Sequence, residues 1–258
     1  MTVPSDVEEA GGRVQSVDRA LRLLGEVADR SGGATVAELA AAADLNRATV
    51  WRLLGTLAAH GLVDRDPASN RYRIGYGVLR LSAAADDESL RRISHPVLEE
   101  VRVRSGETAA LAVIGPKGLT YVDEAKPRSV LAVNWLGREV PLHATSTGKA
   151  FLAWLPALEV ASLLEDTLTR FTEHTITDRA RLDAELAAIR DRGWAGCAGE
   201  LETTLYGVSA PVRPDGHGRP LAIFSIWGTA DRVPVSRFAD LGPEAVQAAA
   251  RIAASLTG

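Results

Sequence analysis

The segment from Thr35 to Gly75 constrains the fold more than any other part of this 258-residue sequence. It contains two short helical patterns, a tight turn between them, and two strand-like runs around a polar loop. Two helices followed by a β-hairpin in this way are the outline of a winged helix-turn-helix. In that motif the second helix enters the major groove of DNA with the residues of its N-terminal end.

The first helix of the motif is expected to begin after Thr35. Thr35 and Glu38 have the T-x-x-E spacing of a capping box, in which each side chain accepts a hydrogen bond from the other residue's backbone N–H. Apolar residues then recur at helical spacing and predict one buried face. They are Val36, Leu39, Ala40 and Ala43.

The second helix is expected to begin at Asn46, a favourable N-cap residue, and to end at Gly61 in a left-handed turn. Its predicted apolar face consists of Val50, Leu53, Leu54, Leu57 and Ala58. Its other face carries, near the N-terminus, Arg47, Ala48, Thr49, Trp51 and Arg52. The runs 62–65 and 72–74 then predict a hairpin around the polar loop 66–70, with Arg71 beside its tip.

The charge distribution supports DNA contact by this segment. Residues 46–80 contain six Arg and two Asp, a net charge of +4, whereas the whole chain has 29 basic and 33 acidic residues and a net charge of −4. The remainder of the chain therefore has a net charge of −8. A basic segment on an acidic body suits phosphate contact in one region and another role elsewhere. The alternative for any single Arg is an ordinary solvated surface.

We therefore predict contacts to bases or phosphates from Arg47, Thr49 and Arg52. We place Asn46 and Ala48 near the DNA backbone or a thymine methyl group, and Arg71 at a phosphate or the minor groove. Trp51 either packs under the helix or touches sugars. A preceding helix from Ser16 is expected to pack with Val17, Ala20, Leu21, Leu24 and Val27 facing inward. The main interpretation of this helix is core packing without a DNA role. Gln15, Ser16 and Arg19 are further candidates for contact with backbone phosphate, and Thr35 is a candidate DNA-binding residue.

Length and composition bound the rest of the molecule. A chain of this length is expected to form two domains, and 46% hydrophobic with 24% charged residues is ordinary globular composition. No apolar run approaches the ~18–20 residues of a membrane span, and the first residues lack a signal-peptide core, so we expect a cytoplasmic protein without a membrane partner. The single cysteine, Cys197, excludes an intrachain disulfide and argues against a thiolate metal site. We expect neither a cofactor nor a metal.

The region after residue 90 mixes helices with strand pairs. Strands are expected at 109–114, 119–124, 130–135, 208–212 and 221–227. Helices are expected at 93–104, 145–155, 156–164 and 178–192, with a last helix from Pro243 to Leu256. Hairpins mixed with helices predict an α+β domain built on an antiparallel sheet. No Ser-His-Asp set, carboxylate pair or phosphate loop indicates an enzyme.

From about Arg13 to the C-terminus the sequence resembles the IclR family of transcriptional regulators. The matching segments include VQSVDRALRLL (14–24), LNRATVWRLLGTLAAHGLVDRD (45–66), YRIG (72–75), GET (106–108), PLHATSTGKAFLAWLP (141–156), TITD (175–178), RGWA (192–195) and VSAPV (208–212). The resemblance implies a winged helix-turn-helix domain at 13–75, a linker helix and hinge at 76–90, and a GAF-like α+β effector-binding domain at 91–258, after a disordered segment 1–12. It also implies dimers, or dimers of dimers, on double-stranded operator DNA.

The resemblance also implies an effector pocket between the sheet and the N-terminus of the helix that follows PLHA. The matching residues here are Ser146, Thr147 and Gly148, where free backbone N–H groups favour an acid group. The alternative is that Thr145 or Ser146 only caps the helix. The other pocket positions of the family correspond to Ala132, Asn134, Cys197, Gly207, Ser225 and Trp227.

Three of these positions depart from the family's pattern. Cys197 stands where Asp is common, Gly207 where Cys is common, and Trp227 where a small residue is common. Loss of the Asp and gain of an indole make the pocket less polar and add a flat stacking surface. We therefore predict that the effector is an aromatic carboxylate, such as a hydroxybenzoate-like compound. The resemblance implies either a repressor or an activator of catabolic genes, and we favour a repressor. The alternatives are an activator, a small aliphatic keto or hydroxy acid, core packing for Trp227, and a nucleophilic or redox-sensing Cys197.

Overall fold

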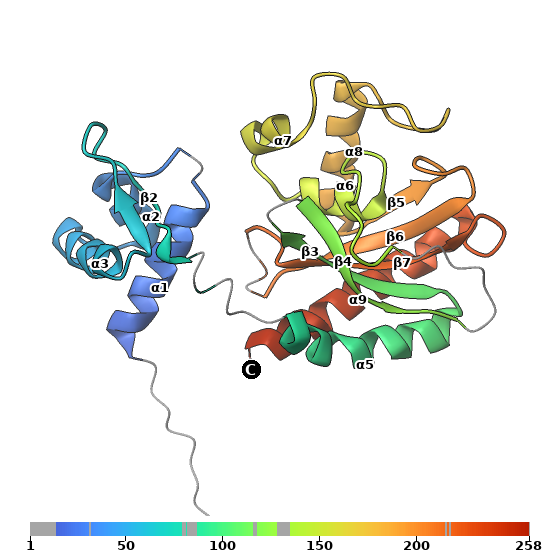
Figure 1. Ribbon diagram of the computed structural model, residues 1–258, viewed down its shortest axis with the longest axis horizontal. Coiled ribbons are helices and arrows are strands. Elements are labelled where there is room, and N and C mark those ends of the chain that lie inside the picture. Colours follow the sequence, from blue (N-terminus) through green and yellow to red (C-terminus); the bar gives the residue numbers. More distant parts are fainter. Residues whose placement is uncertain are drawn as a thin grey trace, which may run out of the picture. The chain divides into compact units, whose positions relative to one another are not determined.

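The computed structural model describes residues 14–30, 32–78, 81, 87–115, 118–127, 135–214, 216 and 218–257. The chain divides into two compact units, Met1–Ala85 and Asp86–Gly258, which are described separately (Figure 1). The segment 1–12, the hinge residues 83–86 and most of the strand expected at 130–135 lie outside the described residues. Two residues expected to line the pocket, Ala132 and Asn134, also lie outside them.

The first unit is a winged helix-turn-helix, as predicted. Its helices are α1 (Gln15–Ala28), α2 (Val36–Ala43) and α3 (Arg47–Ala59), and its wing is the antiparallel hairpin of β1 (Val63–Arg65) and β2 (Tyr72–Ile74). One apolar core joins the three helices and the hairpin. Its fully buried members include Leu23, Val27, Leu39, Val50, Leu54 and Val63.

Local hydrogen bonds fix the two helix starts that the sequence predicted. The Thr35 N–H donates to Glu38 Oε2 at 2.8 Å and the Glu38 N–H donates to Thr35 Oγ1 at 3.3 Å, so both halves of the capping box are present. The Thr49 N–H donates to Asn46 Oδ1 at 2.8 Å and caps α3. Asp44 (φ 51°) and Gly61 (φ 70°) take the left-handed conformation after α2 and α3. These caps and left-handed residues fix where α2 and α3 begin and end.

The predicted inward faces of α1 and α3 need correction. Val17 and Leu21 were expected inside, but they are 54% and 58% exposed, whereas Leu23 is fully buried. Ala58 of α3 was also expected inside and is exposed. Only Leu23 and Val27 of α1 are fully buried in the small core. The face of α1 that packs on α2 and α3 is therefore rotated by part of a turn from the predicted face.

The second unit is an α+β domain, as predicted. Its five strands form an antiparallel sheet in the order β4-β3-β7-β6-β5. The strands are β3 (Thr108–Gly115), β4 (Gly118–Ala125), β5 (Ala195–Ala198), β6 (Leu205–Val212) and β7 (Ala222–Thr229). The helices are α5 (Asp87–Ser105), α6 (Ser146–Leu152), α7 (Ala157–Leu163), α8 (Arg179–Arg192) and α9 (Phe238–Thr257), with a 3₁₀ turn η1 (Val235–Arg237) before α9.

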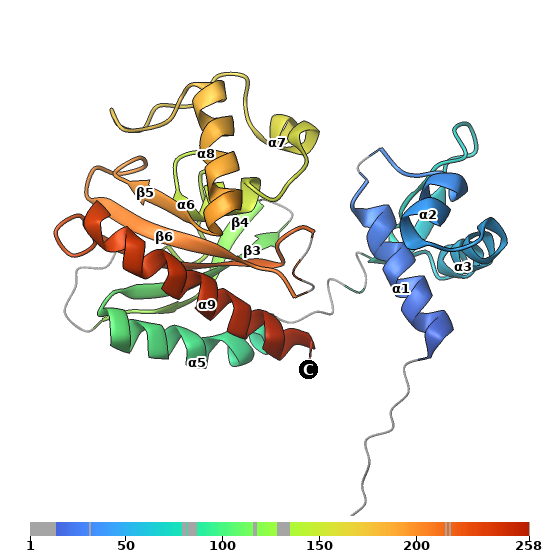
Figure 2. The ribbon, with the colours of Figure 1, turned by 180° about the vertical axis from the view of Figure 1, so that it is seen from behind.

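Each face of the sheet is covered by its own helices. Helices α5 and α9 cover one face, and α6 and α8 lie on the other (Figures 1 and 2). Side chains alternate along each strand, so Phe224 and Ile226 of β7 belong to the α5–α9 core, whereas Ile223 and Trp227 belong to the α6–α8 core. Any site under α6 must therefore be built from the second set.

Several boundaries differ from the sequence prediction. Helix α5 begins at Asp87 rather than Ile93, and α6 ends at Leu152 rather than at 155. Helix α9 begins at Phe238 and contains Pro243, which was expected to open it. Strand β5 was not predicted at all. No helix in the described part of the chain is long and apolar enough to cross a membrane.

Candidate DNA-binding surface and effector pocket

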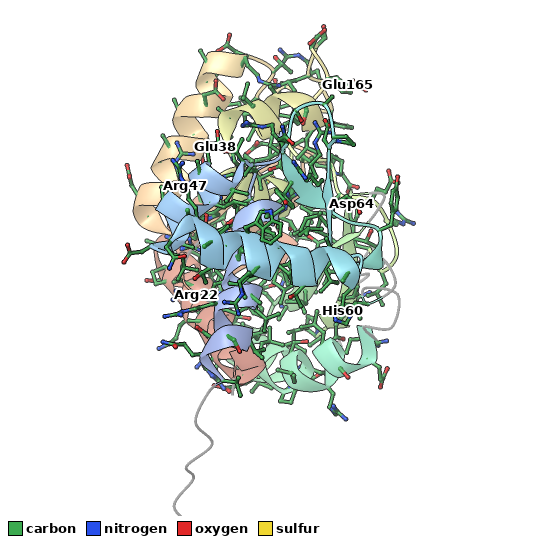
Figure 3. All side chains as sticks on the ribbon, turned by 90° about the vertical axis from the view of Figure 1, so that its left-hand side faces the viewer. Arg22, Glu38, Arg47, His60, Asp64 and Glu165 are labelled. Atoms are coloured by element: carbon green, nitrogen blue, oxygen red, sulfur yellow. The ribbon has the colours of Figure 1, made fainter. Side chains whose placement is uncertain are left out.

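Helix α3 presents its polar side chains to solvent. Arg47, Ala48, Trp51 and Arg52 are exposed, and Thr49 is half-buried. Figure 3 shows α3 along its length, with Arg47 at one end and His60 at the other. Arg47 and Arg52 have no ion-pair partner among the residues that the structure describes. Both guanidinium groups are therefore available to an outside anion.

Two hollows adjoin on this surface. The first lies between α1 and α3, and among its lining residues are Ser16, Arg19, Thr49, Trp51 and Arg52. The second lies between α3, the start of α2 and the wing, and among its lining residues are Thr35, Arg47, Trp51, Arg65 and Asn70. Trp51 borders both and is 62% exposed, so it does not pack under the helix. Gln15 is exposed at the start of α1 and lines neither hollow.

Arg71 is not a free wing residue in this structure. Its Nη2 lies 3.2 Å from Glu38 Oε1, and its Nε donates to the Gly33 carbonyl at 3.2 Å. The hydrogen bond from the Thr35 backbone N–H, followed by the Thr35 side chain, lowers the pKa of Glu38, so this partner stays charged. Contact between Arg71 and a phosphate therefore requires Arg71 to leave, or share, its contact with Glu38.

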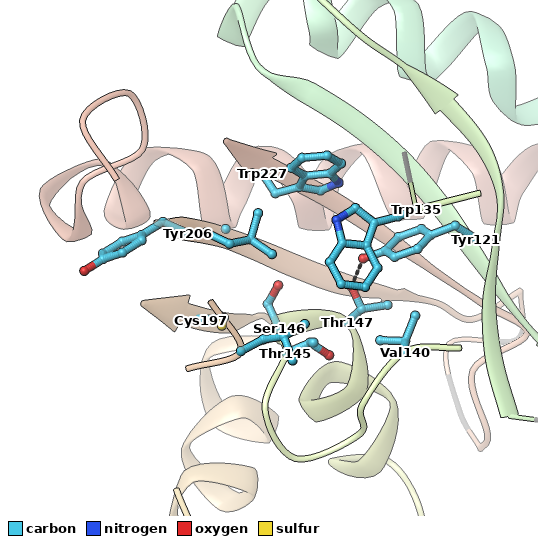
Figure 4. Close-up of a pocket in the computed structure, with 12 residues that line it drawn as sticks. Tyr121, Trp135, Val140, Thr145, Ser146, Thr147, Cys197, Tyr206 and Trp227 are labelled. Carbon is cyan, nitrogen blue, oxygen red and sulfur yellow. Dashed lines mark hydrogen bonds between the residues drawn. The ribbon is translucent and has the colours of Figure 1, made fainter. Parts of the chain in front are cut away.

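A pocket opens between the sheet and the N-terminal end of α6 (Figure 4). The space between its atoms is about 400 Å³, which includes open solvent at its mouth. Five of the residues expected from the sequence come together here: Ser146, Thr147, Cys197, Gly207 and Trp227 line the pocket. The rest of its wall is formed by Tyr121, Trp135, Val140, Thr145, Leu201, Leu205 and Tyr206.

Strand register accounts for the fit of Trp227. Gly207 of β6 lies opposite Trp227 of β7. A Cβ on Gly207 would lie 2.7 Å from Trp227 Cβ and 2.8 Å from the Ile226 carbonyl oxygen, closer than real Cβ contacts come. The bulky Trp227 is therefore accommodated by the missing side chain at Gly207, so these two departures from the family's pattern belong together.

A cluster of buried hydroxyl groups lies beneath the pocket. Thr147 Oγ1 is 2.6 Å from Tyr121 Oη and 3.0 Å from Ser225 Oγ. Ser209 Oγ is 2.8 Å from both Ser225 Oγ and Ser146 Oγ. Burial raises the pKa of Tyr121 to about 12, so its phenol keeps its proton. Ser225, expected as a direct ligand contact, belongs to this cluster rather than to the wall.

Gly148 does not line the pocket. Its N–H donates to Thr145 Oγ1 at 2.9 Å, and a Cβ at this position would clash with the Leu142 carbonyl oxygen 2.3 Å away. Thr145 is thus the N-cap of α6, the alternative considered for it from the sequence, and it also lines the pocket. One of the N–H groups expected to meet an acid group is already bonded to Thr145.

Cys197 is a wall group with a protonated thiol. It is buried, and its Sγ donates to the Ala144 carbonyl at 3.4 Å. Burial first, and then the charge of Glu200, raise the pKa of the thiol to about 11. A nucleophilic or redox-sensing cysteine needs a lowered pKa, so the structure does not support that alternative.

The charged groups near the pocket are paired with each other. Lys149 of α6 is fully buried, and its Nζ lies 2.5 Å from Glu200 Oε1, beside the wall residue Leu201. The pocket wall itself contains no Lys, Arg or His among the described residues. His143 donates from Nε2 to the Thr169 carbonyl at 2.8 Å, a structural hydrogen bond. Among the described residues no group of three or more His, Cys, Asp or Glu is arranged to hold a metal ion.

Sequence reasoning missed six residues of the pocket wall and the buried Ser209 beneath it. The six are Tyr121, Trp135, Val140, Leu201, Leu205 and Tyr206. Alternation along the strands would have placed Tyr121 and Ser209 on the α6 face. Their hydrogen bonds to Thr147 and Ser146 depend on how α6 packs on the sheet, which has no signature in the sequence.

A winged helix-turn-helix unit and an α+β unit with a pocket under α6, joined in one chain, define a DNA-binding transcriptional regulator with a sensory domain. Comparison with known families agrees with this class. Residues 16–67 match the IclR helix-turn-helix domain, and residues 82–254 match the C-terminal domain of bacterial IclR transcriptional regulators. The chain belongs to the IclR family of transcriptional regulators.

Individual proteins show the same likeness along the whole chain. The acetate operon repressor of Salmonella typhimurium is 31% identical over 252 residues, which cover 96% of this chain and 92% of the repressor. A transcriptional regulator structure from Rhodococcus sp. RHA1 is 31% identical with a TM-score of 0.61, covering 95% of this chain and 98% of that one. An IclR homologue from Microbacterium hydrocarbonoxydans, solved with 4-hydroxybenzoate, shares the fold at 22% identity and a TM-score of 0.57, covering 94% and 99%.

Proposed function

We propose that this protein is a repressor of catabolic genes. It leaves its operator DNA, or changes its arrangement on it, when an aromatic carboxylate fills the pocket under α6. The observation that carries the proposal is the pairing of Gly207 with Trp227, which gives a small, uncharged pocket an aromatic wall. The DNA side of the proposal is supported by the free arginines of α3.

The lining of the pocket suits a single aromatic ring, because it is largely apolar and contains two indoles. Trp135 and Trp227 offer flat surfaces for stacking, and Val140, Leu201 and Leu205 offer apolar contact. The Microbacterium homologue of the same fold was solved with a ligand of this chemical class, 4-hydroxybenzoate.

The acid group of the ligand is expected to lie against Ser146 and Thr147. Both line the pocket at the start of α6. A small aliphatic keto or hydroxy acid, the alternative effector, would make the same polar contacts but leave the two indoles without a stacking partner.

Calorimetric titration of the full chain with benzoate, 4-hydroxybenzoate, pyruvate and glyoxylate tests the choice of effector. We expect the aromatic acids to bind and the two small acids to bind at least tenfold more weakly. Tighter binding of pyruvate or glyoxylate would contradict the aromatic assignment and favour the aliphatic alternative.

The DNA contacts are tested by removing one guanidinium at a time. Arg52→Ala should weaken operator binding by ~1–3 kcal/mol, or about fivefold to 150-fold, if Arg52 makes a bidentate base contact. Arg181→Ala on α8 is the matched control, because Arg181 is exposed in the other unit. Unchanged operator affinity of the Arg52 variant would contradict its role.

Self-association completes the proposal. Regulators of the helix-turn-helix type read two half-sites about one helical turn apart, which requires two recognition helices. We therefore expect a homodimer, or a dimer of dimers, and sedimentation of the full chain with and without operator DNA tests it. A monomer at concentrations that saturate the operator would contradict this part.

A further inference from the structure

We infer that Trp51 reads thymine in the operator. Its indole packs against the C5-methyl group that thymine presents in the major groove, so Trp51 is a specificity-determining residue of α3. The inference rests on the proposed contact between α3 and DNA and deepens it, because the free arginines of α3 do not account for an exposed aromatic ring beside them. Two observations carry it: the indole is exposed without a partner, and it lies between two pairs of arginines.

Trp51 differs from the other four tryptophans of the chain. Those four are buried or half-buried, and three of them have an arginine over the ring, whereas Trp51 is 62% exposed. Trp51 makes no hydrogen bond, ring contact or cation–π contact with the residues that the structure describes. An apolar ring of this size gains free energy only when a partner covers it.

The neighbours of Trp51 on the exposed face of α3 leave its indole uncovered. Residues three or four positions apart are neighbours on a helix surface. For Trp51 the exposed ones are Arg47 and Ala48 before it and Gly55 after it. Because Ala48 and Gly55 are small, the indole stands out from a helix face that is otherwise small or cationic.

Arginines lie on both sides of Trp51. Arg19 and Arg52 line the hollow between α1 and α3, and Arg47 and Arg65 line the hollow between α3 and the wing. Trp51 lines both hollows, so it lies between the two pairs of guanidinium groups. Arginines bind the phosphates that follow the two walls of a DNA groove. With one pair at each wall, the indole faces the base edges on the floor of the groove rather than the sugars of one wall.

The chemistry of the base edges then selects thymine. Thymine alone presents an apolar group in the major groove, its C5-methyl, whereas the edges of adenine, guanine and cytosine present donors and acceptors. An indole ring laid on those polar groups removes their water without replacing most of their hydrogen bonds, which costs free energy. The same ring laid on a methyl group removes water from two apolar surfaces, which is favourable. We therefore expect a T·A pair opposite Trp51.

Replacement of thymine by deoxyuridine tests the contact, because the two differ only in the methyl group. In vitro selection by the full chain from a random double-stranded library gives the binding site used as the probe. Each thymine of that site is then replaced in turn, and fluorescence anisotropy measures the affinity. We expect about a fourfold loss at one position, the factor that burial of one methyl group gives. Losses below about twofold at every thymine would overturn the inference.

Trp51→Ala shows whether the indole is the group that reads the methyl. Trp51 is exposed and alanine favours a helix, so the variant should fold. We expect it to bind the thymine site about fourfold more weakly than the unaltered protein does, and to bind the thymine and deoxyuridine sites equally. Arg52→Ala is the matched control, because it removes a neighbouring side chain and should keep the preference for thymine. A preference that survives in the Trp51 variant would assign the methyl contact to another residue and contradict the inference.

Other contacts of the indole give different results. Packing against sugars, or a hydrogen bond from the indole N–H, would make Trp51→Ala weaken binding without any effect of deoxyuridine. Packing against a second copy of the chain would change the sedimentation of the DNA-free variant. Each of these results would show that Trp51 does not read thymine.

Failure of the inference is distinguishable from failure of the proposed DNA contact. If Arg52→Ala and Trp51→Ala both leave the affinity for the selected site unchanged, α3 does not contact DNA as proposed, and the inference fails with that proposal. If Arg52→Ala weakens binding but deoxyuridine has no effect at any position, α3 contacts DNA and only the reading of thymine is wrong.

Discussion

Glu38 serves two interactions that lie on the DNA-binding surface. Its carboxylate completes the capping box of α2 and also pairs with Arg71 beside the wing. Glu38→Gln should keep the cap, because a glutamine oxygen still accepts from the Thr35 N–H. It should release Arg71 and remove a negative charge from the surface. We therefore expect several-fold tighter binding to any double-stranded DNA fragment.

Salt dependence distinguishes a new phosphate contact from a change in folding. One additional neutralised phosphate steepens the slope of log K against log salt by about 0.9. Fluorescence anisotropy over a range of salt concentrations measures that slope. Glu26→Gln is the control, because Glu26 pairs with Arg30 at the end of α1. An unchanged slope in the Glu38 variant would mean that Arg71 already contacts phosphate or never does.

Cys197 permits a direct measurement because it is the only cysteine. Its pKa rises from 9.0 to about 11 in the folded protein, so the thiolate fraction near pH 8 should be about a hundredfold lower than in the unfolded chain. Alkylation by iodoacetamide should be slower in the native protein by at least that factor. Because the folded pKa is the higher one, the stability contributed by the neutral thiol is present below about pH 9 and is lost as pH rises toward 11. Native and urea-unfolded rates that agree would indicate an accessible thiol with an ordinary pKa instead.

At the scale of elements, α6 depends on close approach at Gly148. A Cβ there would lie 2.3 Å from the Leu142 carbonyl oxygen and 2.4 Å from Leu142 Cα, which are backbone atoms that cannot rotate away. Gly148→Ala should destabilise the second unit by ~1–3 kcal/mol or more, because overpacking shifts the helix that forms one side of the pocket. Urea unfolding followed by tryptophan fluorescence measures the change.

Gly25→Ala is the matched control for that change. Gly25 lies inside α1, and a Cβ there would meet nothing within 4 Å. Alanine in a helix interior is favoured over glycine by ~0.5–1 kcal/mol, so this variant should be slightly more stable. Equal effects of the two substitutions would show that packing at Leu142 does not limit α6.

Sequence patterns were sufficient to predict those elements whose boundaries are set by contacts between residues close together in the sequence. The caps at Thr35 and Asn46 are made with residues three positions away, so the sequence predicted them. Helix α9 was misjudged because Phe238 and Leu241 are buried against the sheet, and that packing extends the helix through Pro243 despite its missing N–H. Packing against distant segments has no local signature.

The same limit applies to the pocket. Five residues named from the family resemblance line the pocket, and their contact with an effector stays a prediction; they are Ser146, Thr147, Cys197, Gly207 and Trp227. The resemblance did not identify Tyr121 of β4 or Ser209 of β6, whose hydroxyls bond to Thr147 and Ser146 because α6 packs on that face of the sheet. These hydrogen bonds join separate elements, so no single stretch of sequence contains them.

At the scale of the whole molecule, positive charge is concentrated in the segment that we propose contacts DNA, and the rest of the chain is acidic. Residues 46–80 carry a net charge of +4 in a chain whose total is −4. The polyanion attracts this segment and repels most of the remaining chain, so the salt dependence of operator binding reports chiefly on the winged helix-turn-helix unit. The pocket, in contrast, is buried and lacks charged lining residues among those described, so ligand binding should depend weakly on salt.

Coupling between the two units makes a final prediction that needs no knowledge of their arrangement. An effector shifts operator affinity only by its differential affinity for the two states of the protein, and the coupling is reciprocal. If saturating benzoate weakens operator binding tenfold, or ~1.4 kcal/mol, saturating operator must weaken benzoate binding tenfold. Anisotropy with labelled operator measures the first factor and calorimetry on the protein–operator complex measures the second. Trp227→Leu should reduce benzoate affinity in both states and leave the ratio of the two factors at one. Unequal factors in the unaltered protein would mean that ligand or DNA also changes the number of chains in the complex, because linkage within a fixed assembly allows no other result.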